Sequence, residues 1–187
     1  MKHYKIIGEH HYYSYCRFCF SSKLQPVIDF GNIPLAGGFL PKETKSDVLQ
    51  QEKFYPLVIC FCPNCYLLQV NTAINPDVLF KNYFYFSSSI KTLVEHFESK
   101  ASELKKIYPD SKKRFIVEIG CNDGVFISAL KNKGFKTLGI DPAANIVKPL
   151  IHRGFPIINE YFTQNLAEKI VKEYGQADSI YSFHSLA

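Results

Sequence analysis

Residues 116–124 constrain the fold of this chain more than any other stretch. An apolar run passes through Glu118, a turn bounded by Gly120 and Gly124 follows, and a helical pattern begins directly afterwards. A buried strand that enters a helix through a glycine turn is typical of the ligand-binding loop of a Rossmann-like sheet. We therefore predict a strand at 115–119 that delivers this loop to a nucleotide-like ligand.

A second predicted strand, residues 137–141, ends in another acid. Asp141 follows Gly120 by 21 residues, which matches the roughly 20-residue spacing between a glycine turn and an acid that binds ribose hydroxyls. Further strands are predicted at 155–158 and 178–183, with helices between them. The expected sheet has the strand order 3-2-1-4.

The chemistry of the loop favours a cationic ligand. The loop is not a GxGxxG motif, because Asn122 stands where a second glycine would allow pyrophosphate to approach the backbone. Glu118 and Asp123 would repel phosphate and attract the sulfonium and ammonium groups of S-adenosylmethionine, which suits the loop better than NAD. A plain turn without a ligand is the alternative. The predicted cofactor-binding residues are Glu118, Gly120, Asn122, Asp123, Gly124 and Asp141.

Four cysteines predict a metal site in the first third of the chain. Cys16 and Cys19 form one CxxC pair, and Cys62 and Cys65 form a second pair after 42 intervening residues. Two such turns supply four thiolates, which complete a tetrahedral zinc site and leave no open position for catalysis. Scattered buried cysteines or a redox pair are the alternatives. Cys60 could compete as a ligand, but the spacing favours a packing role for it.

Composition bounds the partners and the location. The chain has 187 residues, is 47% hydrophobic and carries a formal net charge of +5. The positive charges are scattered rather than concentrated in a stripe, which argues against a nucleic-acid partner. No apolar run approaches the roughly 20 residues that a membrane span needs, and the N-terminus lacks a signal-peptide core. We expect a soluble cytoplasmic protein, where reduced thiols favour metal over disulfides.

An aromatic stretch at 80–89 precedes a predicted helix at 90–107. Five aromatics in seven positions come before three serines. These residues could plug a core between two lobes, or Tyr83 and Tyr85 could line a wall for a polyhydroxylated substrate. His96 lies at the edge of the apolar face of the helix, where it could be a packing residue or a catalytic one.

The predicted architecture is α/β. A small zinc-binding, β-rich lobe occupies residues 1–80, an aromatic bridge and amphipathic helix occupy 81–111, and a partial Rossmann-like domain that binds S-adenosylmethionine occupies 112–187.

Taken together, these features make the chain resemble the zinc-containing sugar C-methyltransferases that act on nucleotide-linked deoxysugars. The resemblance spans essentially the whole chain in the expected order. It rests on the two CxxC pairs, residues 31–40, Pro56 and Leu57, Leu68 and Gln69, residues 83–89, His96, residues 118–124, residues 139–142, Asn145, and Ala177 with Asp178.

The resemblance implies zinc, S-adenosylmethionine and a nucleotide-linked keto-deoxysugar as partners, with Tyr83, Tyr85 and His96 as candidate catalytic residues. It also implies that a base removes the proton beside the ketone before the carbon attacks the methyl group.

In the family the segment that matches residues 180–187 continues into a histidine-bearing loop. We therefore expect a fragment, a split gene product or a remnant, with a missing or separately encoded C-terminal half. His184 is a weak substitute for the base. The alternatives are a catalytically incomplete module that docks a partner chain and a zinc-ribbon nucleic-acid binder.

Overall fold

The structure, a computed structural model, describes residues 5–37, 42–43 and 52–185. The chain forms two compact units, Met1–Leu79 and Phe80–Ala187.

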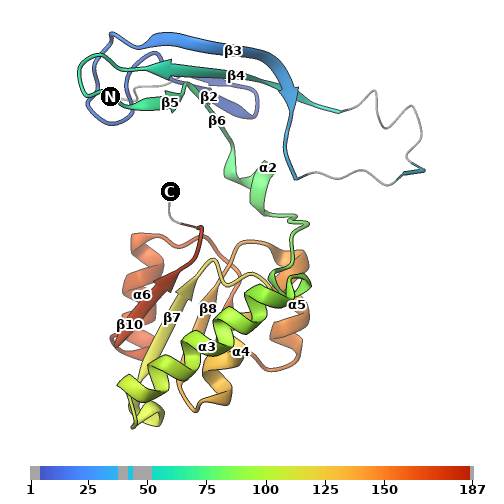
Figure 1. The fold of residues 1–187 in the computed structure, drawn as a ribbon, viewed down its shortest axis with the longest axis vertical. Helices are drawn as coiled ribbons and strands as arrows, with labels where there is room; N and C mark the ends of the chain where they lie inside the picture. Colours follow the sequence, from blue (N-terminus) through green and yellow to red (C-terminus); the bar gives the residue numbers. More distant parts are fainter. Residues whose placement is uncertain (1–4, 38–41, 44–51, 186–187) are drawn as a thin grey trace. The chain divides into compact units, whose positions relative to one another are not determined.

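The first unit holds two antiparallel three-stranded sheets (Figure 1). Strand order is β1-β2-β6 in one sheet and β3-β4-β5 in the other. Gly31, in the left-handed region at φ 70°, lies where the register between β3 and β4 shifts. The strands are β1 (Lys5–Ile7), β2 (His10–Tyr12), β3 (Gln25–Pro34), β4 (Phe54–Phe61), β5 (Leu68–Val70) and β6 (Thr72–Ile74), and helix α2 (Pro76–Phe80) follows them.

Cysteines dominate the interior of this unit. Among its described residues the buried apolar side chains are Cys16, Tyr55, Cys60 and Cys62. A unit of this size with so few buried apolar groups needs a further source of stability, and a structural metal is a common one. The polar loop predicted over 41–53 lies mostly outside the described residues.

The second unit is built on a parallel sheet in the order β10-β7-β8-β9. Numbered along this unit, the order is 3-2-1-4 read from the β9 edge, so the predicted topology is confirmed. The strands are β7 (Phe115–Ile119), β8 (Lys136–Ile140), β9 (Ile157–Ile158) and β10 (Ser179–Ser182). The helices are η1 (Ser87–Ser89), α3 (Lys91–Ile107), η2 (Ser111–Lys113), α4 (Val125–Asn132), α5 (Ala144–His152) and α6 (Gln164–Tyr174).

Successive side chains of β7 point to opposite faces of the sheet, so the core has two layers. Ile116 packs with Phe97 of α3 and Phe126 of α4 on one face of the sheet. Val117, next along the strand, packs with Leu166 of α6 on the other face. Figure 1 shows the sheet between α3 and α6. This α/β sandwich places the loops that follow β7 and β8 at the carboxyl edge of the sheet, where ligands bind in such folds.

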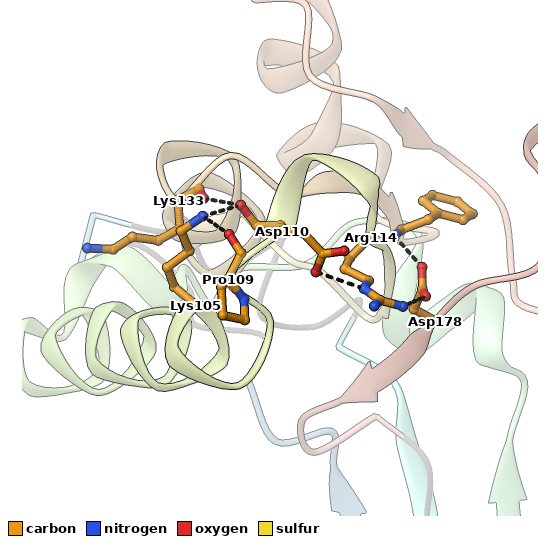
Figure 2. A network of polar contacts seen from close by, with 8 residues as sticks. Lys105, Pro109, Asp110, Arg114, Lys133 and Asp178 are labelled. Atoms are coloured by element: carbon orange, nitrogen blue, oxygen red, sulfur yellow. Dashed lines mark hydrogen bonds and ion pairs between the residues drawn. The ribbon is translucent and has the colours of Figure 1, made fainter.

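A polar network fixes the opposite, amino-terminal edge (Figure 2). Lys105 donates to the Pro109 carbonyl at 2.8 Å and to the Ser111 hydroxyl at 2.7 Å. The Ser111 hydroxyl in turn donates to the Lys133 carbonyl at 2.8 Å. Arg114 lies between two acids, with Nε 3.3 Å from Asp110 and Nη1 3.0 Å from Asp178. The charged side chains of Lys105 and Arg114 therefore help to hold α3, η2 and the sheet together.

None of the described helices is both long and apolar enough to cross a membrane.

Candidate functional site

The structure brings the four predicted metal ligands together in the first unit. The Sγ atoms of Cys16, Cys19, Cys62 and Cys65 all lie within 4.8 Å of one another. The Cys16–Cys65 and Cys19–Cys62 pairs are each 3.6 Å apart. Sulfurs at about 2.3 Å from a tetrahedral zinc lie about 3.8 Å from each other. The cluster therefore has the donors and spacing that fit zinc, while Cys60 lies outside it.

The two CxxC turns have the same backbone geometry. In the first, the Phe20 N–H donates to the Cys16 carbonyl at 3.0 Å; in the second, the Tyr66 N–H donates to the Cys62 carbonyl at 2.8 Å. Phe20 and Tyr66 both adopt positive φ, 59° and 63°, which is unusual for bulky side chains. Backbone strain of this kind persists where surrounding bonds enforce it, and four metal–sulfur bonds would do so.

Two amide side chains donate hydrogen bonds to the cluster. Gln69 Nε2 lies 3.1 Å from Cys16 Sγ, and Asn64 Nδ2 lies 3.3 Å from Cys19 Sγ. The Arg17 N–H donates to Gln69 Oε1 at 2.9 Å and orients the donor. Bonds of this kind stabilise thiolate ligands. Sequence reasoning gave neither amide a role at the metal: Gln69 was named only among the residues that carry the resemblance, and Asn64 only lies inside the second CxxC turn.

The pKa values of thiols in the cluster shift in different directions. Burial raises the pKa of Cys16, but the N–H groups of Cys19 and Phe18 and the Gln69 amide outweigh it and bring this pKa to about 6. The Leu67 N–H lowers the pKa of Cys65, but burial and the neighbouring thiols raise it to about 12. A fourth thiolate is unfavourable next to others, and a divalent cation removes that penalty.

In the second unit, the predicted glycine loop joins β7 to α4. Gly120, Asn122 and Gly124 adopt left-handed conformations, with φ of 73°, 47° and 72°. A Cβ atom at Gly120 would meet the side chain of Ser185, so this position needs glycine for its space as well as its φ. The Gly120 N–H donates to the Ile140 carbonyl at 2.7 Å and ties the loop to the end of β8.

Asp141 holds two loops through backbone N–H groups. Its Oδ2 accepts from the Asn122 N–H at 2.9 Å, and its Oδ1 accepts from the Ala143 N–H at 2.9 Å. The carboxylate therefore orders the turn after β7 and the start of α5 together. Its predicted contact with ribose stays a prediction.

Two buried carboxylate oxygens face no donor in the described part of the chain: Glu118 Oε2 and Asp123 Oδ1. Glu118 is only 3% exposed. Burial, and next the neighbouring Asp141, raises the pKa of Glu118 well above its usual range, although the Ile127 N–H opposes this. Unpartnered buried acceptors are costly. They fit a ligand that brings positive charge and N–H donors, such as the aminoacyl end of S-adenosylmethionine.

A cavity of about 370 Å³ lies beside the loop that follows β8. Asn159, one of its lining residues, donates to the Asp141 carbonyl at 2.9 Å. The cavity is lined by Lys81, Pro142, Asn159, Glu160, Tyr161 and Thr163. Sequence reasoning did not predict this cavity, because the segments after β8 and β9 meet only in the folded sheet.

The candidate catalytic residues divide into two groups. Tyr83 and Tyr85 lie on a segment bonded to α5 and to the glycine loop: the Tyr83 N–H donates to Asn145 Oδ1 of α5 at 3.0 Å, and the Tyr85 carbonyl accepts from Asn122 Nδ2 of the loop at 3.0 Å. His96 is exposed on α3, with its ring centroid 5.7 Å from that of Phe97. His184 is also exposed, and no polar contact within residues 80–185 joins either histidine to the loop.

These features define a class: a Rossmann-like α/β unit with a glycine loop after its first strand, preceded by a four-cysteine unit whose geometry fits zinc. Residues 16–80 match the family described as "Putative zinc binding domain". Residues 93–187, half of the chain, match the family "Methyltransferase domain". The chain belongs to this methyltransferase family, as its sequence resemblance predicted.

Two individual proteins are similar to it. The C-methyltransferase NovU of Streptomyces niveus is 30% identical over 166 residues, which are 89% of this chain and 39% of that protein. The chain thus spans about two fifths of the length of this relative. A crystal structure of a SAM-dependent methyltransferase from Archaeoglobus fulgidus aligns at 25% identity over 34% of this chain and 29% of that one, with a TM-score of 0.26.

Proposed function

We propose that this chain carries the zinc-binding and cofactor-binding parts of an S-adenosylmethionine-dependent C-methyltransferase that acts on a nucleotide-linked keto-deoxysugar. One observation supports it above the others: a segment with two tyrosines is hydrogen-bonded directly to a loop with unpartnered buried carboxylate oxygens. That arrangement suits a hydroxyl-rich acceptor beside a cationic methyl donor. The similarity to NovU supports carbon as the methylated atom.

The residues of the chain have separable tasks in this proposal. Glu118 Oε2 and Asp123 Oδ1, which are buried without a donor among the described residues, would accept hydrogen bonds from the ammonium group of the cofactor, and Asp141 would accept from its ribose. When bound, S-adenosylmethionine would supply the methyl group for the new carbon–carbon bond.

The acceptor side depends on the tyrosines. A base takes the proton from the carbon beside the ketone, and negative charge develops on the ketone oxygen. The Tyr83 and Tyr85 hydroxyls donate hydrogen bonds to that oxygen or hold the sugar hydroxyls. The zinc unit takes no part in the proton or methyl transfer, because four cysteine ligands leave no open coordination position.

The test is methyl transfer from methyl-labelled S-adenosylmethionine to a thymidine-diphosphate-linked keto-deoxyglucose, with cofactor affinity measured by calorimetry. We expect Glu118→Gln to weaken cofactor binding about tenfold or more, in line with a lost charge-assisted hydrogen bond. Glu173→Gln, an equivalent change at an exposed position of α6, should leave affinity unchanged.

Label on a sugar carbon supports the proposal, and label on oxygen overturns it. Absence of cofactor binding by the zinc-loaded chain also overturns it. Cofactor binding without transfer would favour the alternative of a binding module that acts with a partner chain.

A further inference from the structure

The segment from Tyr83 to Ser88 is attached to the glycine loop through its backbone. Asn145 forms a two-way contact with one residue: its Oδ1 accepts from the Tyr83 N–H at 3.0 Å, and its Nδ2 donates to the Tyr83 carbonyl at 2.7 Å. Asn122 repeats the pattern across two residues, donating to the Tyr85 carbonyl at 3.0 Å and accepting from the Ser87 N–H at 3.0 Å. Asp123 Oδ2 accepts from the Ser88 N–H at 3.1 Å.

These contacts explain why asparagine replaces a second glycine in the loop. Position 122 has φ 47°, and asparagine tolerates the left-handed region better than other non-glycine residues. Its planar amide also carries both a donor and an acceptor, so it can pair with a peptide as a neighbouring strand would. Glycine would give the same backbone without that contact.

Backbone attachment leaves the rings of the segment available. Phe84 is 54% exposed, and Tyr85 and Phe86 are each 42% exposed. An exposed aromatic run is usually mobile, because ordering it costs conformational entropy. Here five hydrogen bonds to the peptide groups fix the run without covering its side chains.

We propose that Asn122 and Asn145 are positioning residues for the acceptor substrate: they clamp the peptide groups of Tyr83 to Ser87 and so set where the tyrosine hydroxyls stand relative to the glycine loop. This rests on the proposed function for the identity of the acceptor, a nucleotide-linked sugar. The side chain at position 122 thus positions the tyrosine segment, and its predicted contact with the cofactor stays a prediction.

The sharpest variant is Asn145→Asp. It keeps the size of the side chain and an acceptor for the Tyr83 N–H, but it replaces the donor with an oxygen that faces the Tyr83 carbonyl. Position 145 lies in the first turn of α5, where a negative charge is favourable, so the variant should fold. Asn132→Asp, the same change at an exposed residue at the end of α4, is the matched control.

The first readout needs no ligand. We expect hydrogen–deuterium exchange at the Tyr83 amide to rise about tenfold in Asn145→Asp, because repulsion between the new carboxylate and the Tyr83 carbonyl opens the contact that protects this amide. Exchange in the core of α3 should not change. If Asn145→Asp folds poorly, Asn145→Ala removes both bonds without adding charge and is measured instead.

The second readout is binding of two probes, S-adenosylhomocysteine and the thymidine-diphosphate-linked keto-deoxyglucose. In Asn145→Asp we expect the Kd of the sugar nucleotide to rise about tenfold while that of S-adenosylhomocysteine stays within about twofold, because the lost contact lies on the acceptor side. Asn132→Asp should change neither.

Unchanged exchange at Tyr83 overturns the clamp itself, whatever the ligand. Increased exchange with equal losses for both probes overturns the positioning role and indicates a merely structural one. If wild-type protein binds S-adenosylhomocysteine but not the sugar nucleotide, the acceptor part of the proposed function fails, and the positioning role for that acceptor fails with it.

Discussion

Asp178 bridges Arg114 and the first residue of β7 (Figure 2). Its Oδ1 lies 3.0 Å from Arg114 Nη1, and its Oδ2 accepts from the Phe115 N–H at 2.7 Å. The aspartate immediately precedes β10, which pairs with β7 in parallel. One carboxylate therefore fixes both the register and the starting point of two neighbouring strands.

This relationship predicts acid sensitivity. The Phe115 N–H, and next the Arg114 guanidinium, lower the pKa of Asp178 below its usual value. Stability from a lowered pKa is fully present above the unfolded value of about 4 and is lost as pH falls through the folded value. We expect the melting temperature of the wild-type protein to decrease as the pH is lowered below about 4. Part of this decrease should be absent in Asp178→Asn. Equal acid sensitivity in both proteins would contradict this, and Glu173→Gln is the control.

The cysteine cluster predicts which part of the chain depends on metal. Cys16→Ser should lower the zinc content from about one ion per chain to near zero, because three thiolates bind zinc far more weakly than four. Residues 5–79 should then lose exchange protection while the Rossmann-like unit keeps it. Metal analysis together with hydrogen–deuterium exchange measures both effects.

Cys60→Ala is the matched control for this prediction. Cys60 is buried but lies outside the cluster. Its removal should leave the zinc content unchanged and cost about 1 kcal/mol of stability for the small cavity. Zinc loss in Cys60→Ala, or a normal zinc content in Cys16→Ser, would contradict the assignment of the four cysteine ligands.

The sequence predicted the elements that are set by neighbouring residues better than the contacts between distant residues. The strands at 115–119 and 137–141 and the helix at 90–107 were predicted almost to the residue, against β7, β8 and α3 (Lys91–Ile107). Local hydrophobic period and glycine placement decide such elements. The CxxC spacing likewise encodes its own turn, so the four ligands could be named.

The partners of polar side chains could not be predicted in this way. Gln69 reaches the sulfur of Cys16 from β5, and that contact exists only because β4 and β5 pair in a particular register. Asn122 was predicted as a cofactor contact because it sits in the ligand loop, and that stays a prediction; its amide binds a segment more than 30 residues earlier, which the local pattern did not indicate. Side-chain direction and long-range pairing decide these contacts, and a local sequence pattern predicts neither of them.

Close packing between β8 and the glycine loop predicts a rescue experiment. A Cβ at Gly139 would lie 2.7 Å from Cys121 Sγ and 3.1 Å from Cys121 Cβ. Gly139→Ala should therefore destabilise the protein by about 1–3 kcal/mol, as overpacking does. Cys121→Ala removes the sulfur, so the double variant should recover about 0.5–2 kcal/mol relative to the sum of the single changes. Urea denaturation of all four proteins measures this, and simple additivity would contradict the contact.

The protonation of Glu118 should make both the stability of the protein and its cofactor binding depend on pH. Because burial and Asp141 raise its pKa well above the ordinary value, the folded protein holds a proton that the unfolded chain releases at lower pH. Stability must then fall as pH rises from about 4.5 toward the folded pKa, the opposite sign to Asp178. A bound cation favours the ionised carboxylate, so cofactor binding should release a proton and grow tighter as pH rises through the same window.

Calorimetry in two buffers of different ionisation enthalpy measures that proton. We expect release by wild-type protein and by Glu173→Gln, but not by Glu118→Gln, whose side chain does not titrate. If Glu118→Gln released as many protons as the wild-type protein, another group would be the one that ionises when the cofactor binds. Asp123, whose Oδ1 is also buried without a donor among the described residues, would then be the residue to replace next, because it is the second buried acceptor that the glycine loop presents.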